Sequence, residues 1–238
     1  MKLVDIHCHM LYGVDDGADS ANLMRRMIDC AYRDGVGEIC MTPHYNPVYF
    51  RCVPETVLNR YKEAVMYVSE RYPDMRLYLG QEIYYHHDCV EELVSGKCLT
   101  LNRTRNVLVE FGPYDDRSVI SAGVSHLLTS GFIPVIAHVE RYEAFHKNKS
   151  EMQNLRSLGA LIQVNAASIL GQRGFFVKRF VMSLIKAGLV DIVADDCHDM
   201  KDKAPCLGEA YRVVCRKFGE RTGRRLFVKN PHSVLCDD

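Results

Sequence analysis

The chain has 238 residues, enough for one large domain or two small ones, and hydrophobic residues make up 47% of it. Charged residues make up 25%, so the composition is that of a globular protein with a sizeable core. The 30 basic and 30 acidic residues give a net charge of zero. This balance argues against a nucleic-acid-binding surface and against a polybasic membrane anchor.

The N-terminal sequence MKLVDIHCHM carries a charged residue and two histidines where a signal peptide would need an apolar stretch. No hydrophobic run approaches the length of a membrane span, so we expect no insertion into a membrane. The ten cysteines include no CxxC pair, and several stand in apolar patterns, among them Cys30, Cys40, Cys89 and Cys215. We therefore expect reduced, mostly buried thiols and a cytoplasmic location.

Strand-like and helix-like segments alternate along the chain. Residues 3–6 read as a short buried strand, and Asp19 and Ser20 can cap a helix whose apolar residues recur at helical spacing until Gly35. Residues 37–41 then read as a strand, and Pro54 can open the next helix. The later expected strands span 76–79, 106–109, 133–137, 160–164 and 190–194. The later expected helices span about 89–94, 118–128, 151–158, 175–187 and 206–218.

About seven β-then-α units follow one another without a long linker, a low-complexity tract or a sequence repeat. This alternation favours a parallel sheet with helices outside it, and continuous apolar strands suit a sheet buried on both faces. We expect a single α/β domain over residues 1–238 that closes into a TIM-like barrel, with an open doubly wound sheet as the alternative. The basic run 221–225 is expected to be a solvated turn before a terminal Leu-Phe-Val at 226–228.

Polar side chains with metal-binding chemistry follow several of the expected strands. His7 and His9 come directly after the first strand, and their two-residue spacing places them on one side of an extended backbone. In a barrel of this kind, the carboxyl ends of the strands line the mouth where the active site lies. The candidates at these ends are His7, His9, His44, Glu82, Glu110, His138, Asp196 and His198, with Asp15 or Asp16 as a ninth.

Eight or nine ligands are too many for one zinc or manganese ion, which takes about four to six, so they suit two or three ions. The two carboxylate oxygens of Glu82 could bridge two cations. Cations about 3.5–4 Å apart clamp a substrate oxygen and lower the pKa of a bridging water toward neutrality. Because clustered cations also neutralise anionic oxygens, the pattern favours the hydrolysis of phosphate esters.

Several short motifs stand in a recognisable order. They are His7-x-His9, GVDDGA at 13–18, Thr42-Pro43-His44, Gly80-x-Glu82 with Tyr84-Tyr85, Glu110, His138-x-Glu140-Arg141-Tyr142, Asp196-x-His198 and Asn230-Pro231. In combination they resemble the PHP (polymerase and histidinol phosphatase) superfamily. The closer resemblance is to its bacterial tyrosine-phosphatase branch, the CpsB/YwqE-like regulators of capsule and exopolysaccharide synthesis. The resemblance covers nearly the whole chain.

This resemblance implies a distorted (β/α)7 barrel of the PHP type with two or three divalent ions, usually manganese in this branch. Iron, zinc and cobalt also suit such ligands. Matching motifs imply a first ion on His7, His9, Glu82 and Asp196, and a second that shares Glu82 and takes Glu110 and His138. The third ion would take His44, His198 and either Asp15 or Asp16. Asp15 is favoured because related phosphatases have a histidine at that position.

Arg141 matches an arginine that the branch uses on the substrate phosphate, in keeping with the bidentate binding of phosphate by guanidinium. The branch usually has a second arginine a few residues beyond the last metal-binding histidine. Here Lys203 is the candidate to take its place, as a point charge without the fork. The residues expected to serve catalysis directly are therefore Arg141, Glu110 and Asp196.

These features predict a metal-dependent protein-tyrosine phosphatase in which a metal-activated hydroxide attacks phosphorus. The resemblance implies a phosphotyrosine protein as partner, namely the tyrosine-rich tail of a polysaccharide-synthesis kinase. The alternative is a small-molecule phosphoesterase such as a histidinol-phosphate phosphatase; an amidohydrolase and a barrel that keeps metals only for stability fit less well. Cys206 and Arg212 have the Cys-x5-Arg spacing of cysteine phosphatases, but they stand in a helical pattern, and we interpret the spacing as chance.

Overall fold

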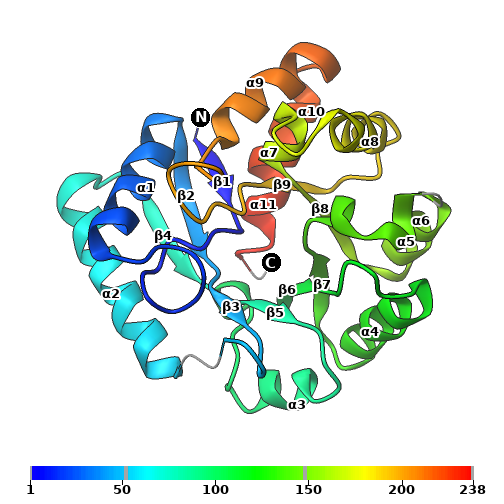
Figure 1. Ribbon diagram of the computed structural model, residues 1–238, viewed down its shortest axis with the longest axis horizontal. Helices are drawn as coiled ribbons and strands as arrows, with labels where there is room; N and C mark the ends of the chain where they lie inside the picture. The colour runs from blue at the N-terminus through cyan, green and yellow to red at the C-terminus, as the bar shows by residue number, and fades with distance from the viewer. Residues whose placement is uncertain (1, 51–52, 147–148, 237–238) are drawn as a thin grey trace.

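The computed structural model describes residues 2–50, 53–146 and 149–236. Its strands form a central ring, and helices surround the ring on the outside (Figure 1). The described strands are β1 (Leu3–Asp5), β2 (Val36–Met41), β3 (His44–Tyr45), β4 (Arg76–Leu79), β5 (Glu82–Tyr84), β6 (Asn106–Glu110), β7 (Ile133–Ile136), β8 (Leu161–Asn165) and β9 (Ile192–Ala194).

The helices follow the strands in the predicted order, with bounds that differ from the expected ones by at most a few residues. In the described part they are α1 (Ala21–Arg33), α2 (Pro54–Arg71), α3 (Cys89–Val94), α4 (Arg117–Thr129), α5 (Glu143–His146), α6 (Lys149–Leu158), α7 (Ala166–Leu170), α8 (Phe175–Lys186), α9 (Leu207–Phe218), α10 (Glu220–Arg224) and α11 (Asn230–Ser233). Two short 3₁₀ segments, η1 (Leu101–Arg103) and η2 (Val139–Arg141), and a π-helical segment, η3 (Arg225–Lys229), complete the set.

The paired strands are parallel and form two sheets in the described part, with strand orders β1-β2-β4 and β3-β5-β6-β7-β8-β9. Strands β2 and β3 lie on one path that breaks at Thr42 and Pro43, and β4 and β5 lie on another that breaks at Gly80 and Gln81. The two sheets therefore continue each other. The breaks redirect the chain just where His44 and Glu82 begin the second half of each path.

The ring closes between the first and the last strand. Beyond their ends, Cys8 and Cys197 form a parallel bridge. The His9 amide donates a hydrogen bond to the Cys197 carbonyl at 2.9 Å, and the Asp196 amide donates to the His7 carbonyl at 2.7 Å. The predicted distorted barrel is thus confirmed, and the open doubly wound sheet is not the fold.

Local sequence signals account for the first helices. In α1, the Ser20 hydroxyl accepts a hydrogen bond from the Leu23 amide at 3.3 Å, which caps the helix as predicted. The apolar residues of α1 recur at helical spacing and are buried against the barrel, namely Met24, Met27, Ile28 and Ala31. Pro54 lies in the first turn of α2, where its missing N–H costs no hydrogen bond.

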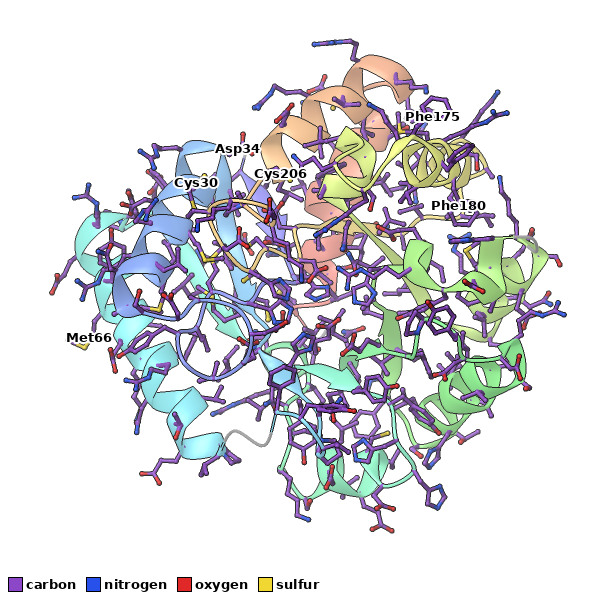
Figure 2. The ribbon with its side chains drawn as sticks, in the orientation of Figure 1. Cys30, Asp34, Met66, Phe175, Phe180 and Cys206 are labelled. Carbon is purple, nitrogen blue, oxygen red and sulfur yellow. The ribbon has the colours of Figure 1, made fainter. Side chains whose placement is uncertain are left out.

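Asp34, which follows the last residue of α1, fixes the start of α9. Asp34 and Cys206 are labelled in Figure 2. Its carboxylate accepts hydrogen bonds from the amides of Gly208 at 2.7 Å and Glu209 at 3.2 Å, and it pairs with Arg212 at 3.1 Å. Position 208 requires glycine, because a Cβ there would lie 2.0 Å from the Asp34 carbonyl oxygen. Arg212 is therefore engaged by Asp34, and buried Cys206 stands at the start of a helix, as the interpretation by chance expects.

The basic run 221–225 is not the solvated turn that the sequence suggested. It lies in a continuous helical stretch made by α10, η3 and α11. Leu226 and Phe227 are both 0% exposed, and η3 packs against β1 and β9. Burial of this apolar pair, rather than the solvation of its charged neighbours, determines the local structure.

The end of the chain covers the amino ends of the strands. The Val234 carbonyl accepts hydrogen bonds from Thr104 Oγ1 at 3.0 Å and from Asn106 Nδ2 at 3.1 Å, at the start of β6. Asn230 Nδ2 donates to the Asp191 carbonyl at 2.8 Å, just before β9. The C-terminal helices thus close the end of the barrel that lies opposite the predicted ligands.

Within the described part of the chain, no helix is both long enough and apolar enough to cross a membrane. The cysteines in this part are free thiols, as the sequence predicted. Cys40 and Cys89 are buried, whereas Cys30 and Cys215 are only partly buried.

Replacement of Leu226 by alanine tests whether the C-terminal helical stretch belongs to the core. Because the side chain is fully buried, Leu226→Ala should lower the free energy of unfolding by about 3 kcal/mol, measured by urea denaturation. Val228→Ala, at a partly buried position in the same segment, is the control and should cost under about 1 kcal/mol. Equal costs at the two positions would show that η3 does not pack as described.

Candidate metal centre

The predicted ligands meet in one cup at the carboxyl ends of the strands. They come from the segments that follow β1, β7 and β9, from the first residues of β3 and β5, and from the end of β6. The buried members are His7, His9, Glu82, His138, Asp196 and His198. His44 and Glu110 are partly exposed, so they border the opening of the cup.

Glu82 lies at the middle of this cup. Its Oε2 atom is 3.1 Å from His7 Nε2, 3.2 Å from His9 Nε2 and 3.1 Å from His44 Nδ1. Its Oε1 atom is 2.8 Å from His138 Nε2. One carboxylate therefore faces four imidazole nitrogens from three segments of the chain, an arrangement suited to a bridging ligand.

Asp196 lies on the other side of the same histidines. Its Oδ1 atom is 3.5 Å from Nε2 of both His7 and His9, while its Oδ2 atom accepts hydrogen bonds from Arg141 and from Asn165 Nδ2. The carboxylate thus presents one oxygen to the cup and uses the other to hold Arg141.

The polar atoms of the cup do not satisfy one another. His7 Nε2 and His9 Nε2 are only 3.2 Å apart, and a neutral imidazole nitrogen without a proton repels another lone pair. Glu82 Oε2, Asp196 Oδ1 and His138 Nδ1 are buried and have no hydrogen-bond partner among the residues that the structure describes. Unpartnered buried polar atoms are costly, so convergent nitrogen and carboxylate donors of this kind fit a divalent cation.

The charges in the cup shift the pKa values of its carboxylates and imidazoles. Burial disfavours the charge of Glu82, but the positive charge of His7 and His44 outweighs it and holds the pKa of Glu82 well below its ordinary value. Burial and the charge of His9 lower the pKa of His198 to about 2, so this ring is neutral. His198 is therefore in the neutral form that can bind a metal ion. The pKa values of His7, His9 and His44 are raised by the neighbouring carboxylates despite burial, so a metal ion would have to displace protons from these rings.

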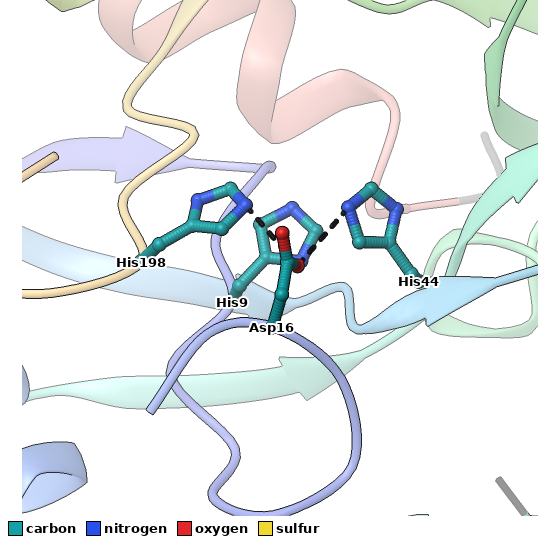
Figure 3. Close-up of side chains that lie close together, drawn as sticks. All are labelled: His9, Asp16, His44 and His198. Atoms are coloured by element: carbon teal, nitrogen blue, oxygen red, sulfur yellow. Dashed lines mark ion pairs between the residues drawn. The ribbon is translucent and has the colours of Figure 1, made fainter. Parts of the chain in front are cut away.

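Asp16 and Asp15 occupy different positions around His9. Asp16 Oδ1 lies 3.5 Å from His44 Nε2 and 3.6 Å from His198 Nε2, so the structure gathers Asp16 with His9, His44 and His198 (Figure 3). Asp15 Oδ2 instead lies 2.7 Å from His9 Nδ1 and accepts the His44 amide at 2.9 Å. The structure therefore brings Asp16, and not the favoured Asp15, into this group of potential ligands.

Two polar residues of β8, which sequence reasoning did not assign, orient the cup. Gln163 Oε1 accepts a hydrogen bond from the His138 amide at 2.7 Å and lies 3.3 Å from His7 Nδ1. Gln163 Nε2 donates to Asn165 Oδ1 at 2.8 Å, and Asn165 Nδ2 donates to Asp196 Oδ2 at 2.7 Å. Their signal in the sequence was two polar residues, two apart, at the end of an apolar strand.

Two of the predicted ligands have unusual backbone conformations. His138 has φ +32° and Asp196 has φ +54°, in the left-handed region that side chains other than glycine rarely adopt. Such conformations persist where the surrounding structure over-determines them, and they cluster at functional sites.

Arg141 and Lys203, the predicted phosphate-binding residues, lie beside the cup. Arg141 pairs with Asp196, and the Lys203 carbonyl accepts a hydrogen bond from the His198 amide at 2.9 Å. Both residues line one hollow at the rim. His86 and His87, by contrast, contact Glu92 and His126 and do not join the described cup.

A distorted parallel barrel with such a cup at the carboxyl ends of its strands is the architecture of PHP-type metalloenzymes. Residues 3–236 match the CpsB/CapC family, described as capsular polysaccharide synthesis. The chain belongs to this family.

Named relatives cover nearly the whole chain. It is 31% identical over 240 residues to the tyrosine-protein phosphatase CpsB of Streptococcus pneumoniae, covering 99% of both chains. It is 34% identical over 223 residues to the tyrosine-protein phosphatase YwqE of Bacillus subtilis, covering 91% of this chain and 85% of YwqE.

The fold agrees with these relatives. A crystal structure from work on YwqE and CpsB, described as unique metal-dependent tyrosine phosphatases, superposes with a TM-score of 0.89 at 31% identity. The match covers 98% of this chain and 94% of that chain. The names of these relatives fit the predicted tyrosine phosphatase and not the histidinol-phosphate alternative.

Manganese should stabilise the folded chain if the cup binds cations. A ligand that binds only the folded state adds about 2.7 kcal/mol at a concentration one hundred times its Kd. Glu82→Gln removes the charge that four imidazoles face, so it should abolish most of this gain, measured as the shift of the thermal midpoint with metal. Glu70→Gln, at an exposed position of α2, is the matched control and should keep the full shift. If divalent metals did not shift the thermal unfolding midpoint of the native chain, the interpretation of the cup as a cation site would be contradicted.

Proposed function

We propose that this chain is a metal-dependent protein-tyrosine phosphatase, a phosphoric monoester hydrolase that removes phosphate from phosphotyrosine. The names of its full-length relatives support this function. The observation that carries it here is the cup around Glu82, where buried imidazole nitrogens converge on two carboxylate oxygens, Glu82 Oε2 and Asp196 Oδ1, that have no hydrogen-bond partner among the described residues.

We assign the ligands by their grouping around Glu82. One ion would be held by His7, His9, Glu82 and Asp196, a set whose ligand atoms lie within 4.8 Å of one another. A second would be held by Glu82, Glu110 and His138, and a third by His44, His198 and Asp16, with Asp16 in place of Asp15. We propose manganese as the metal; iron, zinc and cobalt suit the same donors.

When bound, such ions supply Lewis acidity and a water molecule of lowered pKa. The residues of the chain contribute binding and orientation. Arg141 can grip two phosphate oxygens with its planar guanidinium and keeps its charge at any working pH. Asp196, held by Asn165, fixes Arg141 at the edge of the cup. Glu110 is partly exposed and places Oε1 3.3 Å from His44 Nδ1 at the rim.

The leaving group explains why no strong general acid is needed. A tyrosine phenolate has a parent pKa of about 10, so it departs with less protonation than a serine alkoxide would need. Direct attack on phosphorus requires no covalent phosphoenzyme, and hence no nucleophilic cysteine. Lys203, whose carbonyl accepts the His198 amide, would add a second positive charge for the phosphate.

For the physiological substrate we propose a phosphotyrosine protein of capsule or exopolysaccharide synthesis, specifically the tyrosine-rich tail of a polysaccharide-synthesis kinase. The family to which the chain belongs supports this context. We also propose a cytoplasmic location, which the free thiols of the described cysteines support.

Chelation tests the proposed function directly. Protein whose metal ions have been removed with a chelator should release no phosphate from phosphotyrosine peptides. Added manganese should restore the release of phosphate. Histidinol phosphate should be turned over far more slowly than the peptides. Activity that survives chelation, a covalent phosphoenzyme that can be trapped, or a preference for histidinol phosphate would each reject the proposal.

Paired substitutions test the role of the two aspartates. Asp16→Asn should lower the manganese content after equilibrium dialysis by about one ion per chain, because it removes a ligand. Asp15→Asn should keep the number of bound ions and weaken the affinity of the chain for them roughly tenfold to a hundredfold, because the Asp15 carboxylate only orients His9. The opposite pattern would return Asp15 to the ligand set.

Arg141 should matter for phosphate and not for metal. Arg141→Ala should lower kcat/KM on phosphotyrosine peptides by about a hundredfold, and Arg141→Lys by roughly tenfold, because lysine keeps the charge and loses the fork. Elemental analysis should find the native metal content in both variants. A parallel loss of metal would mean that Arg141 acts by holding Asp196 rather than by binding phosphate.

A further inference from the structure

A hollow of about 510 Å³ opens beside the metal centre, on the side of Arg141. Arg141 of η2 and Lys203 of the β9–α9 segment lie on its wall, and so does Arg173 of the α7–α8 loop. Nothing in the proposed chemistry at the cup requires Arg173.

The cations of this hollow differ in what they contact. The charge of Arg141 is offset by Asp196, with which it pairs. In the described part of the chain, neither the guanidinium of Arg173 nor the ammonium of Lys203 has an ion pair or a hydrogen bond to a carboxylate. Arg156, by comparison, is held by Asp191 at 2.7 Å and is committed to the fold. Arg173 is therefore available to a further ligand, whereas Lys203 is already proposed to act on the target phosphate.

The negative and titratable groups of the hollow do not cancel these charges. Glu140 is 3% exposed and lies at the inner wall, where its Oε1 accepts the Asn165 amide at 2.9 Å. His146 also borders the hollow, with its Nε2 2.8 Å from the Glu140 carbonyl oxygen. Asp199 lies next to Lys203, whose backbone amide donates to Asp199 Oδ1 at 3.0 Å. Arg173 thus remains the positive charge on the wall of the hollow that no described carboxylate pairs with.

We propose that this hollow binds an anionic side chain of the substrate, a carboxylate or a second phosphate, that lies close in sequence to the target phosphotyrosine. This inference rests on the proposed function and names a specificity determinant for it. Arg141 belongs to both sites. When the phosphate of a peptide lies in the cup, the residues next to the phosphotyrosine therefore lie close to the hollow. Arg173 is the distinguishing residue, because it lines the hollow and not the cup.

The expected selectivity is moderate because Arg173 is exposed. Solvent-exposed ion pairs are weak, so each cation should favour an acidic neighbour by about twofold to fivefold in kcat/KM. The preference should shrink as salt is raised from low to physiological ionic strength and beyond, since exposed charges are screened.

The test compares phosphotyrosine peptides that differ only in their neighbours. Three peptides carry glutamate, glutamine or a second phosphotyrosine within three residues of the target, and p-nitrophenyl phosphate reports the cup alone. The manganese-loaded native chain should prefer both anionic peptides over the glutamine peptide. Arg173→Ala should remove about half or more of that preference while leaving turnover of p-nitrophenyl phosphate unchanged.

Arg179→Ala is the matched control, because Arg179 is an exposed arginine of α8 that does not line the hollow. It should keep the native preference. Equal rates on all three peptides, or the same loss in both variants, would overturn the inference while leaving the phosphatase intact. A preference for one anionic peptide alone would identify carboxylate or phosphate as the ligand.

Binding separates this inference from the proposed function. Fluorescence anisotropy of labelled glutamate and glutamine peptides needs no turnover, so it can be measured even if the chain hydrolyses neither. Tighter binding of the glutamate peptide that Arg173→Ala abolishes would support the hollow. Indistinguishable affinities in the native chain would reject it.

Discussion

The structure depends on one electrostatic constraint: the Glu82 carboxylate is buried among imidazoles that cannot all be satisfied by hydrogen bonds. Three imidazole nitrogens lie 3.1–3.2 Å from one of its oxygens. Two of these, on His7 and His9, lie 3.2 Å from each other. Burial makes such an arrangement expensive unless positive charge lies at its centre. Divalent cations meet this requirement, and the same charge that stabilises the cup would attract a phosphate.

The barrel provides this arrangement by interrupting its own strands. The breaks after β2 and β4 turn His44 and Glu82 into the mouth, and left-handed backbone at His138 and Asp196 does the same after β7 and β9. Gln163 then ties the segment after β7 to the segment after β1, through His138 and His7. The proposed ligands therefore sit on a rigid frame, as pre-organised catalysis requires.

Much of this could be predicted from the sequence because parallel barrels place strand ends together. Polar residues after apolar strands were enough to select His7, Glu82, His138 and Asp196. The choice between Asp15 and Asp16 could not be made, because neighbouring residues on a loop point in directions that only the backbone path determines. Gln163 and Asn165 were missed because amide side chains were not counted among the candidate ligands, although their two-residue spacing at the end of an apolar strand was visible in the sequence.

The C-terminal segment shows the same limit for the fold. Its run of arginines suggested a solvated turn, yet η3 is helical because Leu226 and Phe227 are buried beneath the barrel. The charged residues were the feature visible in the sequence and suggested the turn. Burial against β1 and β9, which are distant in sequence, determines the helical structure. Tertiary contacts of this kind cannot be read from a short window of sequence.

The central claim is that cations, and not protons, fill the space around Glu82. Anomalous diffraction at the manganese edge, from crystals grown with manganese, tests it most directly. We predict anomalous peaks within coordination distance of Glu82, with His7, His9 and Asp196 around one of them. Crystals without such peaks, in which these side chains contact only one another and water, would contradict the account.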